Sequence, residues 1–152
     1  MDITEKLKSL GIEIKDAPKP LAAYVPAAKQ GKLVFTAGQL PFKDGVLAHK
    51  GKVGDNISQE DAVKAAEICL INCLSAIKSV TGNLDDIKRF IKVNVYVNAS
   101  PEFTNHPQVA NGASELLVSI FGEAGKHARV AIGVSSLPLG APVEIDLIAE
   151  LK

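Results

Sequence analysis

The segment that most constrains the fold is a long and broadly apolar stretch that begins at Ser58. Ser58 is a favoured N-cap residue, and the acidic Asp61 suits the first turn of a helix, where negative charge is stabilised. Apolar residues then recur over about five turns and cover more than a narrow stripe, until Gly82 ends the pattern. A helix that is apolar over so much of its circumference must be covered, so the rest of the chain has to supply a sheet or other helices against it.

β-Branched runs of strand length indicate three strands in the second half of the chain. They span residues 87–97, 128–134 and 143–151. Residues 21–38 predict a hairpin that turns at Gly31, and residues 107–121 predict a second helix. A helix followed by a strand is typical of a βαβ element.

The first residues and the loop region complete the expected order. Residues 3–10 alternate charged and apolar groups at helical spacing up to Gly11, which predicts a short helix. Residues 41–57 are rich in Gly and Asp, which predicts a loop with one short edge strand. The chain is therefore expected to form one α+β domain over residues 1–152, in which residues 1–11 are a helical extension. Its mixed six-stranded sheet would carry two main helices on one face.

The face of the sheet away from the helices needs a cover of its own, or solvent. Val93, Val95, Ile132 and Val134 are expected there, and their apolar character predicts that this face is buried in an oligomer. The chain would then supply one covering layer, and a second copy would supply the other.

Composition and cysteine placement argue against several functions. Seventeen Lys and Arg balance seventeen Asp and Glu, with no long run of one sign, which argues against a dedicated binder of nucleic acid or of anionic membranes. Cys69 and Cys73 are four residues apart on the long predicted helix, where they suit buried apolar positions better than a disulfide or a zinc site. The start of the chain has no signal-peptide core, and no stretch is long enough to span a membrane, so a cytoplasmic protein is expected.

Arg129 carries the most functional information, because it is a fixed charge in an otherwise apolar strand pattern. Strand alternation puts Arg129 on the same side as the very small Ala131 and Gly133, which would leave room for a ligand above them. A planar guanidinium suits two-point binding of a carboxylate or a phosphate. Glu144 opens the polar side of the following strand, and a structural Arg–Glu pair at a sheet edge or subunit contact is the alternative interpretation.

The histidines give a weaker signal. His49, His106 and His127 are scattered along the chain and are interpreted as loop or surface residues. His127 stands apart from the others because it lies two residues before Arg129. No Cys-His or Ser-His-Asp set of the kind used in nucleophilic catalysis is recognisable.

Several short motifs, taken together, resemble one known family. They are Tyr24-Val25-Pro26-Ala27, the run Gly31-Lys32-Leu33-Val34-Phe35-Thr36-Ala37-Gly38-Gln39-Leu40-Pro41, Asn111, Ala128-Arg129, Leu137-Pro138 and Val143-Glu144-Ile145. This pattern over residues 20–150 resembles the Rid (YjgF-like) family of reactive-intermediate deaminases, whose older name is endoribonuclease L-PSP. The longer loop at 44–57 indicates a variant branch.

The resemblance implies a chorismate-mutase-like fold and a homotrimer around a central barrel of sheets, with small clefts between subunits. It also implies an activity, the hydrolysis of 2-imino acids that arise from enamines released by pyridoxal-phosphate enzymes. The products would be 2-oxo acids and ammonia, and no metal or organic cofactor would be required. By the same resemblance Arg129 clamps the substrate carboxylate and Glu144 holds or activates the attacking water. Tyr24, Gly38 and Asn111 border the ligand.

The chain also departs from the family pattern beside the expected site. The family often has Ser before the Gly-Gln pair, where this chain has Ala37, and Ser then Cys or Val after the arginine, where it has Val130 and Ala131. Ala37 and Ala131 therefore fall at ligand-bordering positions but offer no hydroxyl or thiol. Tyr24 and Asn111 also allow purely structural roles, as a core aromatic and a helix-surface residue. A non-catalytic carboxylate-binding or chaperone-like module is the alternative function, and a ribonuclease or translation inhibitor, suggested by the older family name, is a third.

Overall fold

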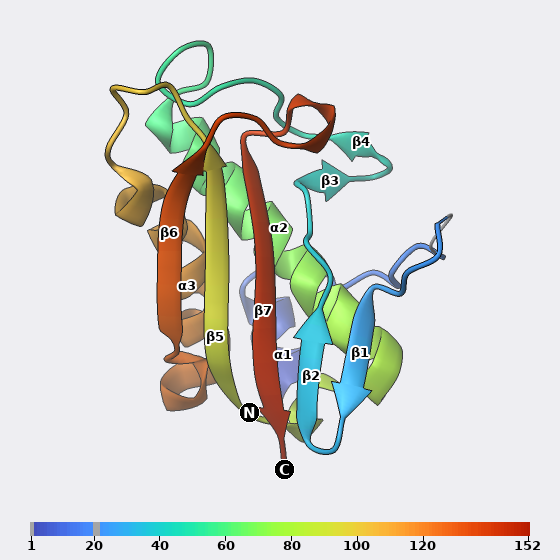
Figure 1. Ribbon diagram of the computed structural model, residues 1–152. Helices are drawn as coiled ribbons and strands as arrows, with labels where there is room; N and C mark the ends of the chain where they lie inside the picture. Colours follow the sequence, from blue (N-terminus) through green and yellow to red (C-terminus); the bar gives the residue numbers. More distant parts are fainter. Residues whose placement is uncertain (1, 20–21) are drawn as a thin grey trace.

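A five-stranded sheet with helices on one face is the centre of the molecule (Figure 1). It is seen in a computed structural model that describes residues 2–19 and 22–152. The strands lie in the order β1-β2-β7-β5-β6. Their bounds are Ala27–Gln30 for β1, Leu33–Thr36 for β2, Ile87–Asn98 for β5, Ala128–Val134 for β6 and Val143–Leu151 for β7. The predicted α+β class and mixed sheet are confirmed, because β5 and β6 run parallel while the other neighbours are antiparallel.

The two long helices are both crossover connections. In Figure 1, α2 (Gln59–Thr81) and α3 (His106–Phe121) lie behind the sheet and cover that face. Strands β2 and β5 each pair antiparallel with β7, so β2 and β5 run parallel to one another, and α2 lies between them in the chain. Strands β5 and β6 pair parallel, and α3 connects them. The βαβ prediction is therefore confirmed. The helices pack closely where they meet, since a Cβ on Gly112 would lie 2.5 Å from the backbone oxygen of Val63.

Local sequence explains where the helices begin and end. The Oγ of Ser58 accepts a hydrogen bond from the backbone N–H of Asp61 at 3.1 Å, and Gly82 closes α2 in a left-handed conformation, with φ of 76°. The short helix α1 (Ile3–Ser9) likewise ends before Gly11, whose φ is 69°. These ends confirm both helix predictions, and α3 confirms the third within one residue.

The predicted hairpin is also present as β1 and β2. Its turn contains Gly31 at a φ of 59°, where a residue without a Cβ is favoured. Leu21, which opens the predicted hairpin segment, lies outside the described residues. The remaining short elements are the 3₁₀ turns η1 (Leu84–Asp86), η2 (Gly122–Gly125) and η3 (Pro138–Gly140).

The prediction of six strands in the main sheet is wrong, because the described chain places five there. The segment expected to give the extra strand forms a separate ribbon instead, β3 (Phe42–Lys43) with β4 (Val46–Leu47). Asp44 and Gly45 in its turn have φ of 54° and 81°, the pattern of a tight two-residue hairpin. The ribbon closes on itself and therefore leaves no strand to extend the main sheet.

The sheet has a covered face and an open face, and one prediction about them is wrong. Val93 and Val95 are fully buried in the core that the sheet shares with the helices, so they are not on the open face. Ile132 and Val134 have the opposite parity, since they pair with Tyr96 and Asn98 rather than with the buried valines. In β5 the alternation of Val93 and Val95 with Asn94 matches the covered side. In β6 the more apolar side, with Ile132 and Val134, is the open one, so alternation on this edge strand does not indicate which side the helices cover.

The two cysteines lie on the buried side of α2. Cys69 and Cys73 are fully buried as free thiols, and their Sγ atoms lie 3.5 and 3.4 Å from the backbone oxygens of Val143 and Ile145. Burial raises the pKa of both thiols, so they act as small core residues, as predicted. Within the described part of the chain, no helix combines the length and the apolar character needed to cross a bilayer.

Candidate functional site

Arg129 lies on the edge strand β6 and reaches across to α3. It pairs with the buried Val93, so its side chain points toward the covered face of the sheet. There its Nη1 donates to Asn111 Oδ1 at 2.9 Å and to Ser114 Oγ at 3.1 Å. Asn111 and Ser114 are three residues apart on α3, a spacing that places both side chains on one side of a helix. The structure thus joins Arg129 to the predicted Asn111.

The rest of the Arg129 guanidinium is free of protein partners. The side chain is half-buried, yet no carboxylate among residues 2–19 and 22–152 lies within ion-pair distance of it. The two hydrogens of Nη1 are directed at Asn111 and Ser114, while Nε and Nη2 make no hydrogen bond to the described residues. These two nitrogens form one edge of the fork, and that edge matches the two oxygens of a carboxylate. The alternative of a structural Arg–Glu pair within one chain is therefore wrong.

His127 extends this cluster. Its Nε2 lies 2.9 Å from Ser114 Oγ, and its Nδ1 lies 2.7 Å from the backbone oxygen of Gly125. Burial lowers the pKa of His127, and the charge of Arg129 lowers it further, against an opposing effect of the Gly125 carbonyl. His127 is thus neutral at pH 7. In the sequence only the closeness of His127 to Arg129 is apparent, and Ser114 was missed because a serine within a helix has no motif of its own.

The small residues that follow Arg129 do not leave an open floor. Ala131 is half-buried and packs against the hydrophobic core. At Gly133 the space is taken by the protein itself, because a Cβ there would lie 2.5 Å from Nε2 of His106. The prediction of ligand space directly above Gly133 is therefore wrong, because the partly exposed ring of His106 occupies it. A ligand at Arg129 would have to approach from the free edge of the sheet.

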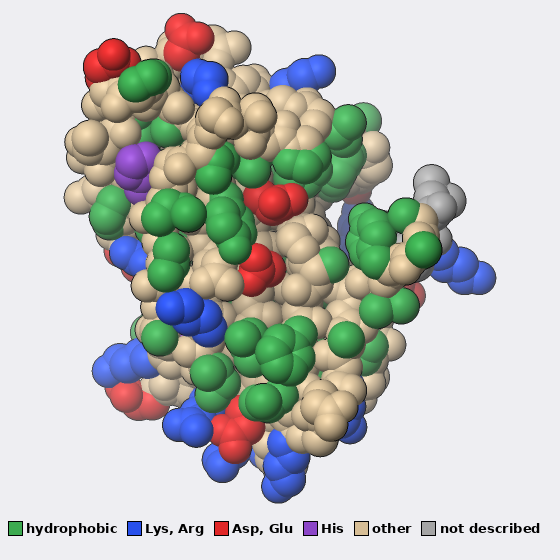
Figure 2. Space-filling view, viewed as in Figure 1, with side chains coloured by type: hydrophobic (Ala, Val, Ile, Leu, Met, Phe, Trp, Pro, Cys, Tyr) green, Lys and Arg blue, Asp and Glu red, His purple; other side chains and the backbone are tan. Residues whose placement is uncertain are grey.

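Glu144 lies on the other face of the sheet. It pairs with Tyr96, whose parity on β5 is opposite to that of Val93 and Val95. Asp146 follows on the same side of β7 and accepts a hydrogen bond from Asn94 Nδ2 at 2.7 Å. Partial burial raises the pKa of the Glu144 carboxyl, and repulsion from Asp146 raises it further. Figure 2 views this face and shows acidic side chains set among apolar ones.

The backbone after β2 runs directly beside Glu144. A Cβ on Gly38 would lie 3.0 Å from Glu144 Cδ, so a glycine is what allows this approach. Gln39 holds the segment in place by exchanging backbone hydrogen bonds with Ile145, at 2.7 and 3.0 Å.

Tyr24 and Ala37 belong to the same region as Gly38. The backbone N–H of Ala37 donates to the oxygen of Pro26 at 2.8 Å, which places the segment that carries Tyr24 alongside the Gly38 turn. Tyr24 itself is 63% exposed, so it is not the core aromatic that one interpretation expected. Two groups result: the arginine group of Asn111, Ser114, His127 and Arg129, and the glutamate group of Ala37, Gly38 and Glu144. The structure does not bring the Tyr24 side chain into the glutamate group of the same copy.

One copy of the chain keeps these two groups apart. β5 separates β6 from β7, and the partners of Arg129 and Glu144 on β5 are Val93 and Tyr96. Three residues of rise and two inter-strand spacings put the two Cα atoms roughly 14 Å apart. The side chains also leave opposite faces of the sheet. A site that uses both residues cannot form within one chain.

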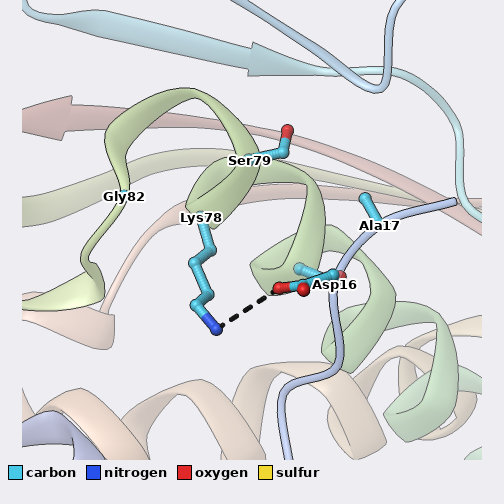
Figure 3. A pocket seen from close by; sticks show the side chains of 6 residues that line it. Asp16, Ala17, Lys78, Ser79 and Gly82 are labelled. Atoms are coloured by element: carbon cyan, nitrogen blue, oxygen red, sulfur yellow. Dashed lines mark ion pairs between the residues drawn. The ribbon is translucent and has the colours of Figure 1, made fainter. Parts of the chain in front are cut away.

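Two hollows of the described surface lie elsewhere. One of about 310 Å³ is lined by Asp16, Ala17, Ser75, Lys78, Ser79 and Gly82, near the C-terminal end of α2 (Figure 3). Its charged groups face each other, with Lys78 Nζ 3.7 Å from Asp16 Oδ1. A neighbouring hollow of about 340 Å³ lies against α1. Neither is lined by a residue of the arginine or glutamate group, and no group of three or more His, Cys, Asp or Glu within the described residues is arranged to hold a metal.

Comparisons with known proteins agree over nearly the whole chain. The sequence profile of the YjgF/chorismate mutase-like family, whose description also names an endoribonuclease, matches residues 4–151. Protein TCP17 of Trypanosoma cruzi is 41% identical over 151 residues, which cover 99% of this chain and 94% of the relative. The 2-iminobutanoate/2-iminopropanoate deaminase of Dermatophagoides farinae is 24% identical over 136 residues, or 90% and 91% of the two chains.

A solved structure gives the same result for the fold. The crystal structure of an Agrobacterium tumefaciens protein with unknown function matches with a TM-score of 0.92 at 42% identity, covering 99% of this chain and 92% of that one. The mixed sheet with its crossover helices is thus the chorismate-mutase-like fold that the sequence motifs implied. By profile, sequence and structure, the chain belongs to the YjgF-like, or Rid, family.

Proposed function

We propose that this protein hydrolyses 2-imino acids to 2-oxo acids and ammonia, in a site that a second copy of the chain completes. The observation that carries the proposal is the free edge of Arg129, a half-buried cation held by a neutral amide and a neutral hydroxyl rather than by a carboxylate. An unpaired charge of this kind is costly unless a ligand satisfies it. A small acid is the ligand that fits.

The reaction needs little beyond orientation of its two reactants. Nε and Nη2 of Arg129 bind the carboxylate of the 2-imino acid, which fixes the neighbouring imine carbon. Water adds to that carbon, with its proton passing to Glu144 and a proton returning to nitrogen, and the resulting carbinolamine loses ammonia to leave the 2-oxo acid. A carboxyl whose pKa is raised suits both steps, because it accepts a proton from water more readily than an ordinary carboxylate and can then give it back.

The arrangement of the two groups supports a site between copies. Arg129 lies on an unpaired sheet edge, while Glu144 lies on the open face. Ile132 is 44% exposed on that same face and Phe35 is 40% exposed on β2, so apolar surface is available for contact. Contact between two different surfaces repeats from copy to copy, and it closes into a ring when the rotation between copies closes. A homotrimer, as the family resemblance implies, provides three such sites.

The name of one relative supports the same chemistry. The Dermatophagoides farinae protein is named a 2-iminobutanoate/2-iminopropanoate deaminase, and its substrates carry the carboxylate and the imine that the proposed site would hold. The proposal for this chain rests first on Arg129 and its surroundings, and the relative adds the reaction class.

The direct test is ammonia release from freshly generated 2-iminopropionate. We expect the wild-type protein to speed this release well above the spontaneous rate in buffer, and to need no added metal or cofactor. An equal concentration of a protein without this fold is the control for general buffer effects. Ammonia release at the spontaneous rate would contradict the proposed enzyme activity.

Glu144 should determine how the activity depends on pH. Because its basic form accepts the proton from water, activity should rise as the pH rises through the raised pKa of Glu144. Asp146→Asn removes the repulsion that contributes to the raised pKa, so the acidic limb of the pH profile of kcat/KM should move to lower pH. Asp55→Asn, in an exposed loop, should leave that limb in place. A limb that stays fixed in Asp146→Asn would show that repulsion from Asp146 does not raise the pKa of the group that titrates.

A second candidate is binding of small carboxylates without turnover. It is favoured by the position of Ala131, which offers no polar atom on the same side of β6 as Arg129. Titration calorimetry with pyruvate would then show saturable binding in a protein that releases no ammonia. Absence of pyruvate binding would contradict this candidate.

A further inference from the structure

The hydrogen bonds around Ser114 have a fixed direction. Nδ1 of His127 faces only a carbonyl oxygen, that of Gly125, so Nδ1 must carry the proton and donate it. In the neutral ring Nε2 is then the acceptor, and the hydroxyl of Ser114 donates to it at 2.9 Å. The oxygen of Ser114 keeps its lone pairs for Arg129 Nη1, which donates to it at 3.1 Å. The chain of donors thus runs from the guanidinium to the backbone of η2.

This series of hydrogen bonds determines which edge of the Arg129 guanidinium is available to a ligand. Asn111 and Ser114 together take both hydrogens of Nη1, and rotation of the guanidinium about its own axis would break both bonds. The plane of the fork is therefore fixed, and Nε with Nη2 is the edge left over. A freely rotating arginine would lose conformational entropy on binding a ligand, whereas this one is already ordered.

We infer that Ser114 and His127 are positioning residues, which hold the Arg129 guanidinium so that its Nε and Nη2 edge receives the carboxylate of the substrate. His127 acts through Ser114, because it fixes the hydroxyl proton away from Arg129 and leaves the oxygen as an acceptor. The inference rests on the proposed function only for the identity of the ligand. The ordering of Arg129 itself is a property of the free protein.

Four variants separate this role from a general structural one. Ser114→Ala removes the acceptor for Nη1, and His127→Phe removes the acceptor for the Ser114 proton. His127→Gln is the conservative variant, since its amide oxygen can still accept that proton. Ser119→Ala, on the exposed side of the same helix α3, is the matched control.

The first measurement is the NMR signal of the Arg129 side chain in ¹⁵N-labelled protein without ligand, assigned with Arg129→Lys. Wild type, Ser119→Ala and His127→Gln should give separate Nη signals, because rotation of the guanidinium is hindered. Ser114→Ala and His127→Phe should give averaged signals. Averaged Nη signals in the wild type, or separate signals in Ser114→Ala, would overturn the inference whether or not the protein is an enzyme.

The second measurement is pyruvate binding by calorimetry, together with KM and kcat for 2-iminopropionate. Loss of one hydrogen bond to a charged group should weaken pyruvate binding and raise KM about tenfold in Ser114→Ala and His127→Phe, with a smaller change in kcat. His127→Gln should stay within about threefold of wild type, because the acceptor is kept. Equal losses in His127→Gln and His127→Phe would overturn the positioning role. If the variants show this pattern of pyruvate binding but the wild-type protein releases no ammonia, only the proposed enzyme activity is contradicted.

Discussion

Arg129→Ala is expected to lower kcat/KM for 2-iminopropionate by at least about 100-fold, since two hydrogen bonds from a charged group to the substrate are lost together. Most of the loss should be in KM, because the carboxylate is held in the ground state as well as in the transition state. Arg129→Lys should recover only a small part, because a single ammonium cannot give two parallel hydrogen bonds. The measurement is steady-state ammonia release at several substrate concentrations.

The matched control for this change is Arg89→Ala. Arg89 is an exposed arginine on β5 that pairs with Glu150 at 2.6 Å, on the surface and outside both groups of site residues. Its loss should leave kcat and KM near the wild-type values, because exposed ion pairs contribute little. Circular dichroism would show that both variants are folded. Wild-type kinetics in folded Arg129→Ala would disprove the carboxylate site.

Mixing two inactive variants should restore activity. Arg129→Ala lacks one half of the site and Glu144→Gln lacks the other, so neither should be active alone. If the protein is the proposed homotrimer, and mixed trimers are isolated after co-expression of the two variants with different tags, one of the three sites in each ring again has both residues. Mixed trimers should therefore show about one third of wild-type activity.

The control for the mixing experiment uses two variants of the same half. Mixed trimers of Arg129→Ala and Asn111→Ala should be no more active than Asn111→Ala alone. Arg129 and Asn111 must come from the same copy, and neither variant has both. Suppose that Arg129→Ala recovers activity with Glu144→Gln but not with Asn111→Ala. The site would then lie between two copies, with Arg129 and Asn111 on one copy and Glu144 on the other. No recovery in either mixture would mean that Arg129 and Glu144 do not act in one site.

Much of the fold was predictable because its signals are local. The N-cap at Ser58, the left-handed Gly82 and the β-branched run of β5 each depend on a few neighbouring residues, and the structure has them where the sequence places them. The separate ribbon β3–β4 was also marked locally, by the Asp44-Gly45 pair that favours a tight hairpin. It was missed because the region was predicted to be a loop with one short edge strand rather than a hairpin.

The faces of the sheet could not be predicted in the same way. The alternation of Val93 with Asn94 marks the covered side of β5, but in β6 the more apolar side, with Ile132, is the open one. The two strands could therefore not be matched face to face without their register. The same limit applies at Gly133, where the small residue makes room for His106 of the protein rather than for a ligand. Such contacts join residues that are distant in sequence, and residue type alone does not reveal them.

The candidate site was predicted in part. Arg129 and Asn111 were expected near the ligand, and the structure joins them by a hydrogen bond of 2.9 Å. Ser114 was missed because a serine within a helix is common and has no motif of its own. Its role becomes visible only when His127, thirteen residues further on, is seen 2.9 Å away.

The placement of Arg129 and Glu144 on opposite faces of the sheet has a consequence for the protein at low concentration. A lone chain would keep the cation that captures an acid and would lack, on that side, the carboxylate that acts on water. Dilution would therefore abolish turnover before it abolished capture. Under the proposed function, specific activity should depend on protein concentration, and the assembly would work as a switch between a carrier of small acids and an enzyme.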